Sequence, residues 1–328
     1  MNRLLVIIVT YNAMRWIERS FASLAASSVP CDIFVVDNGS TDGTLAWLEE
    51  HRADNLIVKR SESNCGFGAG NNVGLRYAVE RGYDYVYLLN QDAWVAEDCF
   101  EKLIAAAGTH PGYGILSPVQ LQADWKTPDR LFRKHCGKAL EAAVSGSGLG
   151  SGSGSGSGSE SGSESGSVSE SGLASGTDEA SAIDAEVVPV KFVMAAHWLI
   201  SRECLETTGG FSPTFSQYGE DENYIDRARY WAFRTGVVPA AKAVHDRAQR
   251  VSSRAAQMRL KYIGCVARLS DPGRRFPRFR LVFECLRITG MSLRRLSWTM
   301  LCYLPRLVRF MPVILKNRIA STRRRAFI

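Results

Sequence analysis

The sequence contains no Cys-x-x-Cys pair, and its eight cysteines are scattered without regular spacing. Zinc modules usually take their ligands from such close pairs, so we expect no zinc site. Scattered cysteines fit reduced, structural thiols in the cytoplasm. No charged stretch followed by an apolar core precedes residues 4–10, which already have the composition of a buried strand. We therefore expect no cleaved signal peptide and a chain that stays in the cytoplasm.

Acidic residues are nearly absent from the last quarter of the chain. Residues 247–328 contain 20 Lys or Arg against two acids, Asp271 and Glu284. This segment carries a net charge of +18, which leaves −11 on residues 1–246 out of the total of +7. A basic segment beside an acidic body indicates an anionic surface as its partner.

The glycine-rich stretch at residues 63–74 lacks the G-x-G-x-x-G order of a dinucleotide-binding loop. It also follows the third expected strand instead of the first, so we predict no Rossmann cofactor site. Its small residues still allow the backbone to pass close to a ligand, and we expect a helix over residues 73–80 directly after it.

Apolar, β-branched runs alternate with segments of helical spacing along the first 120 residues. Strands are expected at residues 4–10, 33–36, 55–59, 83–87 and 114–118. Helices are expected at residues 13–26, at 98–108 and after a cap at Ser40 or Thr41. This alternation predicts an α/β fold with a mostly parallel sheet flanked by helices.

Residues 145–176 are nearly pure Ser and Gly with a few Glu. Such a stretch buries too little apolar surface to offset its ordering entropy, so we expect a flexible loop, and an engineered linker is an equal alternative. Because strands and helices resume afterwards, we expect one domain over residues 1–250 with this insertion, followed by a basic helical region over residues 251–328.

Four polar sites stand out at the ends of expected elements. Asn90, Gln91 and Asp92 follow a buried strand, where oxygen ligands can hold a divalent cation and a diphosphate, although a turn or cap has the same pattern. Glu220 and Asp221 open a helix, where acids also serve as caps. The others are His245, which on its own could be a core residue, and His197-Trp198, which could stack on a sugar or simply pack.

Six segments, taken together and in this order, resemble the family 2 glycosyltransferases with the GT-A fold, including rhamnosyltransferase-like members. They are residues 9–12 (VTYN), 36–44 (VDNGSTDGT), 64–72 (NCGFGAGNN), 89–92 (LNQD), 209–211 (GGF) and 218–221 (YGED). The resemblance covers about residues 4–250. It implies an inverting enzyme that uses a nucleotide-diphosphate sugar, such as a UDP- or dTDP-sugar.

The resemblance also implies a role for particular residues. Asp221 matches the general base, and the metal ligands would be Asp92, His245 and Asn90, holding Mn²⁺ or Mg²⁺. Asn90 departs from the acid found in many members, which lowers the charge of the metal site. The donor would be bound by Thr10, Tyr11, Asn12, Asp37, Asn64, Gly66, Asn72, Asn90, Gln91 and Asp92, and the acceptor by His197, Trp198 and Glu220.

The basic tail predicts one long amphipathic helix from Arg280 onward. Six cations, at 280, 287, 294, 306, 309 and 316, would share one arc, opposite an apolar face at 293, 296, 300, 303, 304, 307, 310, 311 and 314. Pro305 and Pro312 should kink this helix. Repeated arginines disfavour a membrane span, and an anionic membrane surface, contacted through residues 275–328, fits best. Packing on the catalytic domain or on a second subunit in a homo-oligomer is the alternative; nucleic acid is not expected.

The expected function is transfer of a sugar to a lipid-linked or polysaccharide acceptor at the cytoplasmic face of the plasma membrane. A sugar-1-phosphate nucleotidyltransferase is disfavoured, because Thr10-Tyr11-Asn12 follows the first strand in place of a basic, glycine-rich loop. A non-catalytic nucleotide-sugar-binding scaffold of the same fold remains the alternative.

Overall fold

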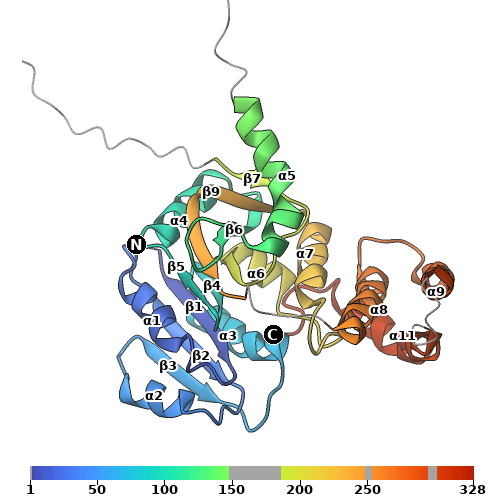
Figure 1. Cartoon of the computed structure of the whole chain (residues 1–328), viewed down its shortest axis with the longest axis horizontal. Coiled ribbons are helices and arrows are strands. Elements are labelled where there is room, and N and C mark those ends of the chain that lie inside the picture. Colours follow the sequence, from blue (N-terminus) through green and yellow to red (C-terminus); the bar gives the residue numbers. More distant parts are fainter. Residues whose placement is uncertain (1, 148–185, 248–252, 295–300) are drawn as a thin grey trace, which may run out of the picture.

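The computed structural model describes residues 2–147, 186–247, 253–294 and 301–328 (Figure 1). Its centre is a nine-stranded sheet with the order β3-β2-β1-β4-β8-β6-β9-β5, and β7 pairs with β9. The strands are β1 (Leu4–Thr10), β2 (Asp32–Asp37), β3 (Leu56–Arg60), β4 (Tyr85–Asn90), β5 (Ala93–Val95), β6 (Tyr113–Leu121), β7 (Val188–Pro189), β8 (His197–Ser201) and β9 (Arg234–His245). The expected α/β architecture is confirmed.

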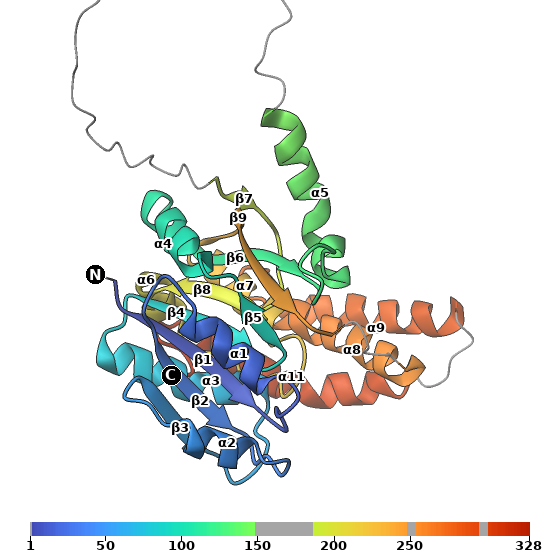
Figure 2. The same ribbon diagram turned by 60° about the vertical axis from the view of Figure 1, so that its left-hand side comes forward.

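Helices cover both faces of the sheet (Figures 1 and 2). One core cluster joins the sheet to α1 (Ile17–Ala25), α2 (Thr44–Glu50) and α4 (Cys99–Thr109). The other joins it to α3 (Phe67–Arg81), α5 (Arg130–Ser147), α6 (Arg202–Thr208) and α7 (Glu220–Tyr230). Strands β3, β2, β1 and β4 are parallel. The apolar runs of β1, β2 and β4 predict this, because such runs are buried on both faces, whereas β3 is the half-exposed edge strand. Antiparallel pairs enter through β5, β7 and β8.

Helix α3 begins at Phe67, so the prediction that it starts at residue 73 was wrong. Gly70 and Gly74 belong to this helix, and their lack of a side chain lets it pack directly against β1. A Cβ at Gly70 would approach Val9 to 2.8 Å, and one at Gly74 would approach Ile7 to 2.8 Å. The cap predicted for α2 was also wrong, because its N-cap is Gly43 in the left-handed region.

Gly74→Ala is expected to lower the free energy of unfolding by about 1–3 kcal/mol, because the added methyl overpacks the contact with β1. Urea unfolding followed by circular dichroism measures this. Gly108→Ala is the matched control, since a Cβ at this α4 glycine meets nothing within 4 Å. Equal stability of the two variants would show that α3 can move away from β1 at no cost.

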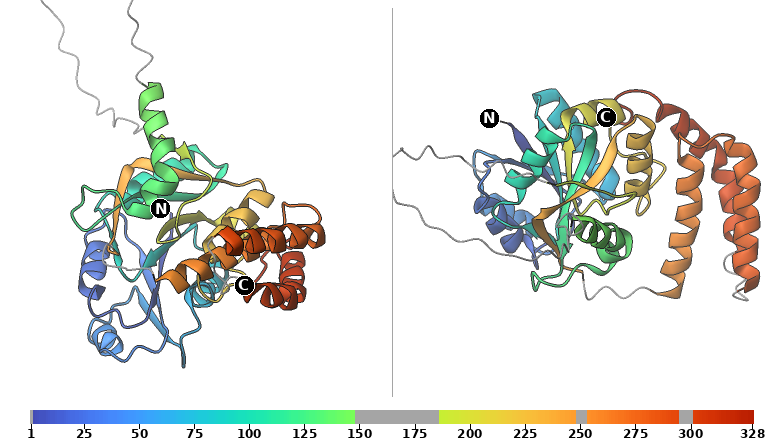
Figure 3. Two further views of the ribbon diagram at one scale, coloured as in Figure 1. Left: turned by 45° about the vertical axis from the view of Figure 1, so that its right-hand side comes forward. Right: turned by 90° about the horizontal axis from the view of Figure 1, so that it is seen from above.

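The C-terminal region forms α8 (Arg254–Ser270), α9 (Pro277–Arg294) and α11 (Tyr303–Ala320), which lie together at one end of the molecule (Figure 3). These are separate helices, so the prediction of one long helix was wrong. Leu307, Met311 and Ile314 are buried in a core shared by the three helices. Pro305 is the third residue of α11, where its missing N–H costs no helical hydrogen bond. Within the described ranges, no helix is long and apolar enough to cross a membrane.

The two sides of the Ser-Gly stretch join the same sheet. Residues 145–147 end α5, and residues 148–176 of the stretch lie outside the described residues. Strands β7 to β9, which follow it in sequence, complete the sheet begun by β1 to β6.

Candidate active site

A cleft of about 850 Å³ opens at the carboxyl ends of β1, β2 and β4. Its other walls come from the loop before α3, the first turn of α7, the end of β9 and one face of α8. A larger, mainly apolar cavity of about 1110 Å³ lies elsewhere, between α1, α2 and β3. The smaller cleft is lined by the predicted base, by the three predicted metal ligands and by several of the predicted donor-binding residues, so we place the site there.

Asn90, Asp92 and His245 come together at one edge of this cleft. Antiparallel pairing of β5 with β9 places Ala93 opposite His245 and so brings the ring beside Asp92. The Nε2 atom of His245 lies 3.5 Å from Oδ1 of Asp92 and 3.4 Å from the side-chain nitrogen of Asn90. Asp92 and His245 are both buried, and Nδ1 of His245 has no hydrogen-bond partner within the described part of the chain.

These three side chains offer one carboxylate, one imidazole and one amide. In the described residues, no three His, Cys, Asp or Glu side chains converge as a metal-binding group. The set nevertheless fits a hard divalent cation that takes its remaining ligands from diphosphate oxygens.

Glu220 and Asp221 form the opposite part of the cleft, in the first turn of α7. The helix follows Gly219, whose φ of +85° permits the sharp entry and which has no side chain to cap the helix. Both acids lie in the first turn, where the helix dipole also favours negative charge, so the capping alternative stays open. Burial raises the pKa of Asp221 to about 6, while its Oδ1 accepts a hydrogen bond from the Glu222 amide at 2.8 Å. Burial and the charge of Asp221 raise the pKa of Glu220 to about 7.

Tyr11 and the glycine-rich loop form the side of the cleft near β1. Gln91 fixes the backbone of Tyr11, accepting its N–H at 2.6 Å and donating to its carbonyl at 3.2 Å. Tyr11 as a whole residue is 47% exposed. Asn64 accepts the Gly66 amide at 2.9 Å, and a Cβ at Gly66 would overlap the carbonyl oxygen of Ser216.

Asp37 shapes the loop after β2. Its buried carboxylate accepts hydrogen bonds from Thr10 Oγ1 at 3.0 Å and from the amides of Gly39 and Ser40 at 3.1 and 2.9 Å. Asn12 fixes the same loop by accepting the Thr41 amide at 2.8 Å. Contact of Thr10, Asn12 and Asp37 with the donor stays a prediction.

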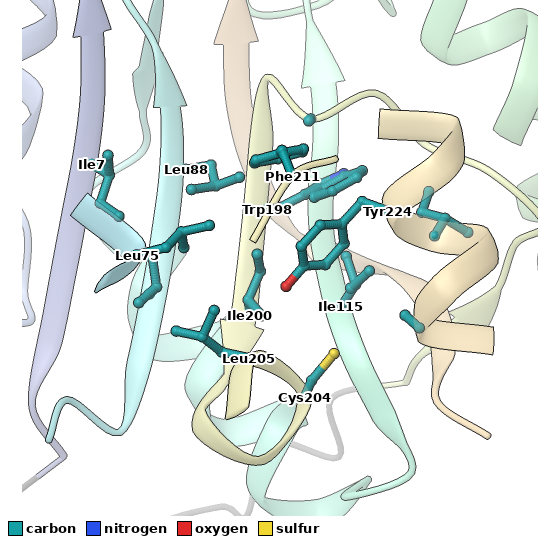
Figure 4. Packing of buried hydrophobic residues seen from close by; sticks show 14 of the residues in the cluster. Ile7, Leu75, Leu88, Ile115, Trp198, Ile200, Cys204, Leu205, Phe211 and Tyr224 are labelled. Atoms are coloured by element: carbon teal, nitrogen blue, oxygen red, sulfur yellow. The ribbon is translucent and has the colours of Figure 1, made fainter. Parts of the chain in front are cut away.

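The acceptor role of His197 and Trp198 was wrong, because both side chains are fully buried. The apolar run before them does not continue as one strand, and β8 starts at His197. Trp198 packs with Phe211 and Tyr224 inside the sheet–helix core (Figure 4). His197 binds the Tyr87 hydroxyl at 2.9 Å and the Val244 carbonyl at 3.0 Å.

Asn72, predicted to bind the donor, instead holds the Gly-Gly-Phe segment in place. Its amide donates to the Phe211 carbonyl at 2.9 Å and accepts the Phe211 amide at 2.6 Å. Both polar atoms of the side chain are therefore used, and Asn72 does not line the cleft. From its position in α3, the side chain points toward the loop before α7, and not toward the carboxyl ends of the strands.

Several cleft residues were not identified from the sequence. Asn38 follows Asp37 and accepts the Cys65 thiol at 3.0 Å. Arg247 is held by a bidentate ion pair with Asp129, at 2.8 and 3.0 Å, which lowers the pKa of that carboxyl. Arg259 and Leu260 reach the cleft from α8. Asn38 lies inside the segment 36–44, so its place beside Asp37 could have identified it, but only the tertiary packing of α8 brings the side chains of that helix here.

Comparisons with known proteins agree with this arrangement. A family model described as glycosyl transferase family 2 matches residues 5–140. An undecaprenyl-phosphate mannosyltransferase of Micrococcus luteus is 29% identical over 33% of this chain and 45% of its own length, so the chain spans less than half of that relative. An N-acetylglucosaminyl-diphospho-decaprenol L-rhamnosyltransferase of Mycobacterium tuberculosis is 24% identical over 74% of this chain and 76% of its own.

Among solved structures, residues 1–349 of Staphylococcus aureus TarS in complex with UDP-GlcNAc match with a TM-score of 0.53 and 17% identity. The match covers 98% of this chain and 83% of that one. The likeness shows the fold, and the predicted GT-A architecture is thereby confirmed.

Proposed function

The chain is a family 2 glycosyltransferase, and on that premise we propose that it inverts the anomeric carbon of a UDP- or dTDP-sugar as it transfers the sugar to an acceptor hydroxyl. One observation carries the proposal: Asp92, His245 and Asn90 gather at one edge of a single cleft that Asp221 also lines. A transferase needs both groups, one for the leaving diphosphate and one for the attacking hydroxyl.

Asp221 would act as the general base. The acceptor hydroxyl must lose its proton as its oxygen attacks the face opposite the leaving group, and a carboxylate within hydrogen-bond reach can accept that proton. With its pKa raised to about 6, Asp221 is a stronger base than an ordinary carboxylate and is still mostly ionised at pH 7. Glu220, beside it in the same helical turn, would orient the acceptor.

Asp92, His245 and Asn90 would bind Mn²⁺ or Mg²⁺ together with the donor diphosphate. When bound, such a cation neutralises the charge that develops on the departing nucleoside diphosphate. Tyr11, which is exposed and whose backbone Gln91 holds, would flank the nucleotide, and the loop at Asn64 and Gly66 would approach it through its backbone.

A lipid-linked or polysaccharide hydroxyl is the proposed acceptor, and the cytoplasmic face of the plasma membrane the proposed site of action. The names of the two relatives support this, since both include a polyprenyl carrier. In this chain the support is the wall that α8 contributes, where Leu260 and Ile263 lie beside Arg259. Apolar groups next to a cation suit an amphiphile with an anionic head group.

A donor panel tests the proposal. UDP- and dTDP-sugars are incubated with Mn²⁺ and either polyprenyl-diphosphate-linked sugars or oligosaccharides as acceptors, and free nucleoside diphosphate is measured. We expect release that depends on the acceptor, and a product with the anomeric configuration opposite to that of the donor by NMR. Donor binding without release under every condition would instead support the alternative of a non-catalytic nucleotide-sugar-binding scaffold.

A further inference from the structure

Helix α9 carries an apolar stripe on its solvent side. Five side chains form it: Phe279, Val282, Phe283, Leu286 and Leu293. At 100° per residue they fall within an arc of roughly 100°. They are between 58% and 71% exposed, which is unusual for aromatic and aliphatic residues of this size. The α9 stripe is therefore a continuous apolar surface that no described part of the chain covers.

The opposite side of α9 is fixed against its neighbours, so the direction of the stripe is set. Ile288 is buried in the core shared with α8 and α11. Glu284 forms a bidentate ion pair with Arg268 of α8, at 2.6 and 2.7 Å. Turning the stripe inward would break both contacts. Figures 1 and 3 show α9 with α8 and α11 at one end of the molecule, away from the sheet.

The charges around the α9 stripe indicate what covers it. Arg275, Arg280 and Arg287 are exposed near it. Glu284, the single acid in the sequence of α9, is buried and paired with Arg268. A second copy of this chain would bring the same cations against themselves, which disfavours self-association. An anionic bilayer surface can bind both parts of this region. The apolar side chains enter the boundary between head groups and acyl chains, and the arginines interact with the lipid phosphates.

We propose that the α9 stripe inserts into the interface of an anionic membrane, with Arg280 and Arg287 at the lipid phosphates. This builds on the proposed membrane attachment of residues 275–328 but assigns it to a different surface. The sequence pointed to an apolar face that includes Leu307, Met311 and Ile314, which the structure buries in the helical core. Helix α8 contacts α9 and also lines the cleft, so a single helix joins the proposed membrane contact to the site.

Co-sedimentation of the full-length protein with vesicles tests this. The vesicles contain phosphatidylglycerol and phosphatidylcholine, or phosphatidylcholine alone, and no nucleotide sugar is present. We expect the wild type to bind the anionic vesicles, and F279S/F283S/L286S to bind them at least about tenfold more weakly, because three large apolar side chains no longer leave water. R280E/R287E should also lose binding. The matched control, W125S/Y230S, removes exposed aromatic side chains outside α9 and should bind as the wild type does.

Three further measurements, of fluorescence, oligomeric state and turnover, separate the possible results. Phe283→Trp should gain fluorescence that is quenched by brominated lipids, which locates the stripe in the bilayer. Vesicle binding by F279S/F283S/L286S equal to that of the wild type would overturn the inference. So would a wild-type dimer that this variant separates into monomers, because a second copy would then cover the stripe. Donor turnover, measured in the same preparations, tests the proposed function separately from membrane binding. If the wild type and the variants bind vesicles as expected but no turnover is seen, only the proposed function is refuted.

Discussion

Replacing Asp221 with Asn is expected to lower sugar transfer by a factor of about 10²–10⁴, the usual contribution of a general base. Asn is nearly the same size and keeps an oxygen that can accept the Glu222 amide, so the first turn of α7 should persist. It cannot take the proton of the acceptor hydroxyl. Donor affinity, measured by calorimetry with the nucleotide sugar alone, should stay unchanged, because the attacking group takes no part in donor binding.

Asp226→Asn is the matched control, since it makes the same substitution in the same helix. Asp226 lies outside the cleft and pairs with Arg229 at 2.7 Å. Burial raises its pKa to about 6, like that of Asp221. The two variants therefore differ in position and not in acidity, and full transfer activity of Asp221→Asn would remove this residue from the role of base.

The pH dependence of transfer tests the role of Asp221 as the base in a second, independent way. A carboxylate acts as a base when it has lost its proton, so activity should be present above the pKa of Asp221, about 6, and fall about tenfold per unit below it. This loss of activity below pH 6 should also be seen in Asp226→Asn. In Asp221→Asn, the residual rate should no longer show it.

The sequence was sufficient where one local signal determined the structure. The unbroken apolar run of β1 could only be buried on both faces, and the polar residues at the ends of β1 and β4 had to meet at one sheet edge. Helical periodicity in the tail was less informative, because an apolar face looks the same in sequence whether lipid or another helix covers it. Leu307 and Ile314 face other helices, while Phe279 and Phe283 face solvent.

The direction in which a side chain points was the other property that the sequence did not predict. Asn72 lies in one of the family segments and Trp198 was a candidate to stack on a sugar, yet Asn72 turns toward Phe211 and Trp198 enters the core. A motif fixes a position along the chain, and the neighbouring elements decide which way the residue points. The same reasoning explains why Arg259 and Leu260, far from any motif, line the cleft: the packing of α8 on α7 puts them there.

Asp92→Asn is expected to lower transfer by about 10²–10³, the range seen when one group that stabilises transition-state charge is removed. The change preserves the shape of a buried side chain and removes its charge, so His245 would have two neutral amides as neighbours, that of Asn90 and the one introduced at position 92. Neutral donors hold a divalent cation far less well than a carboxylate does. Donor affinity should therefore stop responding to Mn²⁺, which calorimetric titration of the nucleotide diphosphate with and without the ion measures directly.

The matched control is Asp98→Asn, which makes the same substitution outside the cleft. Asp98 is more exposed than Asp92 and pairs with Lys102 at 2.5 Å. This variant should keep both transfer and the Mn²⁺ dependence of donor binding. If Asp92→Asn keeps them too, Asp92 and His245 meet for structural reasons, and the diphosphate is neutralised elsewhere in the cleft. Arg247 and Arg259 would then be the groups to replace, because they are the arginines that line it in the described part of the chain.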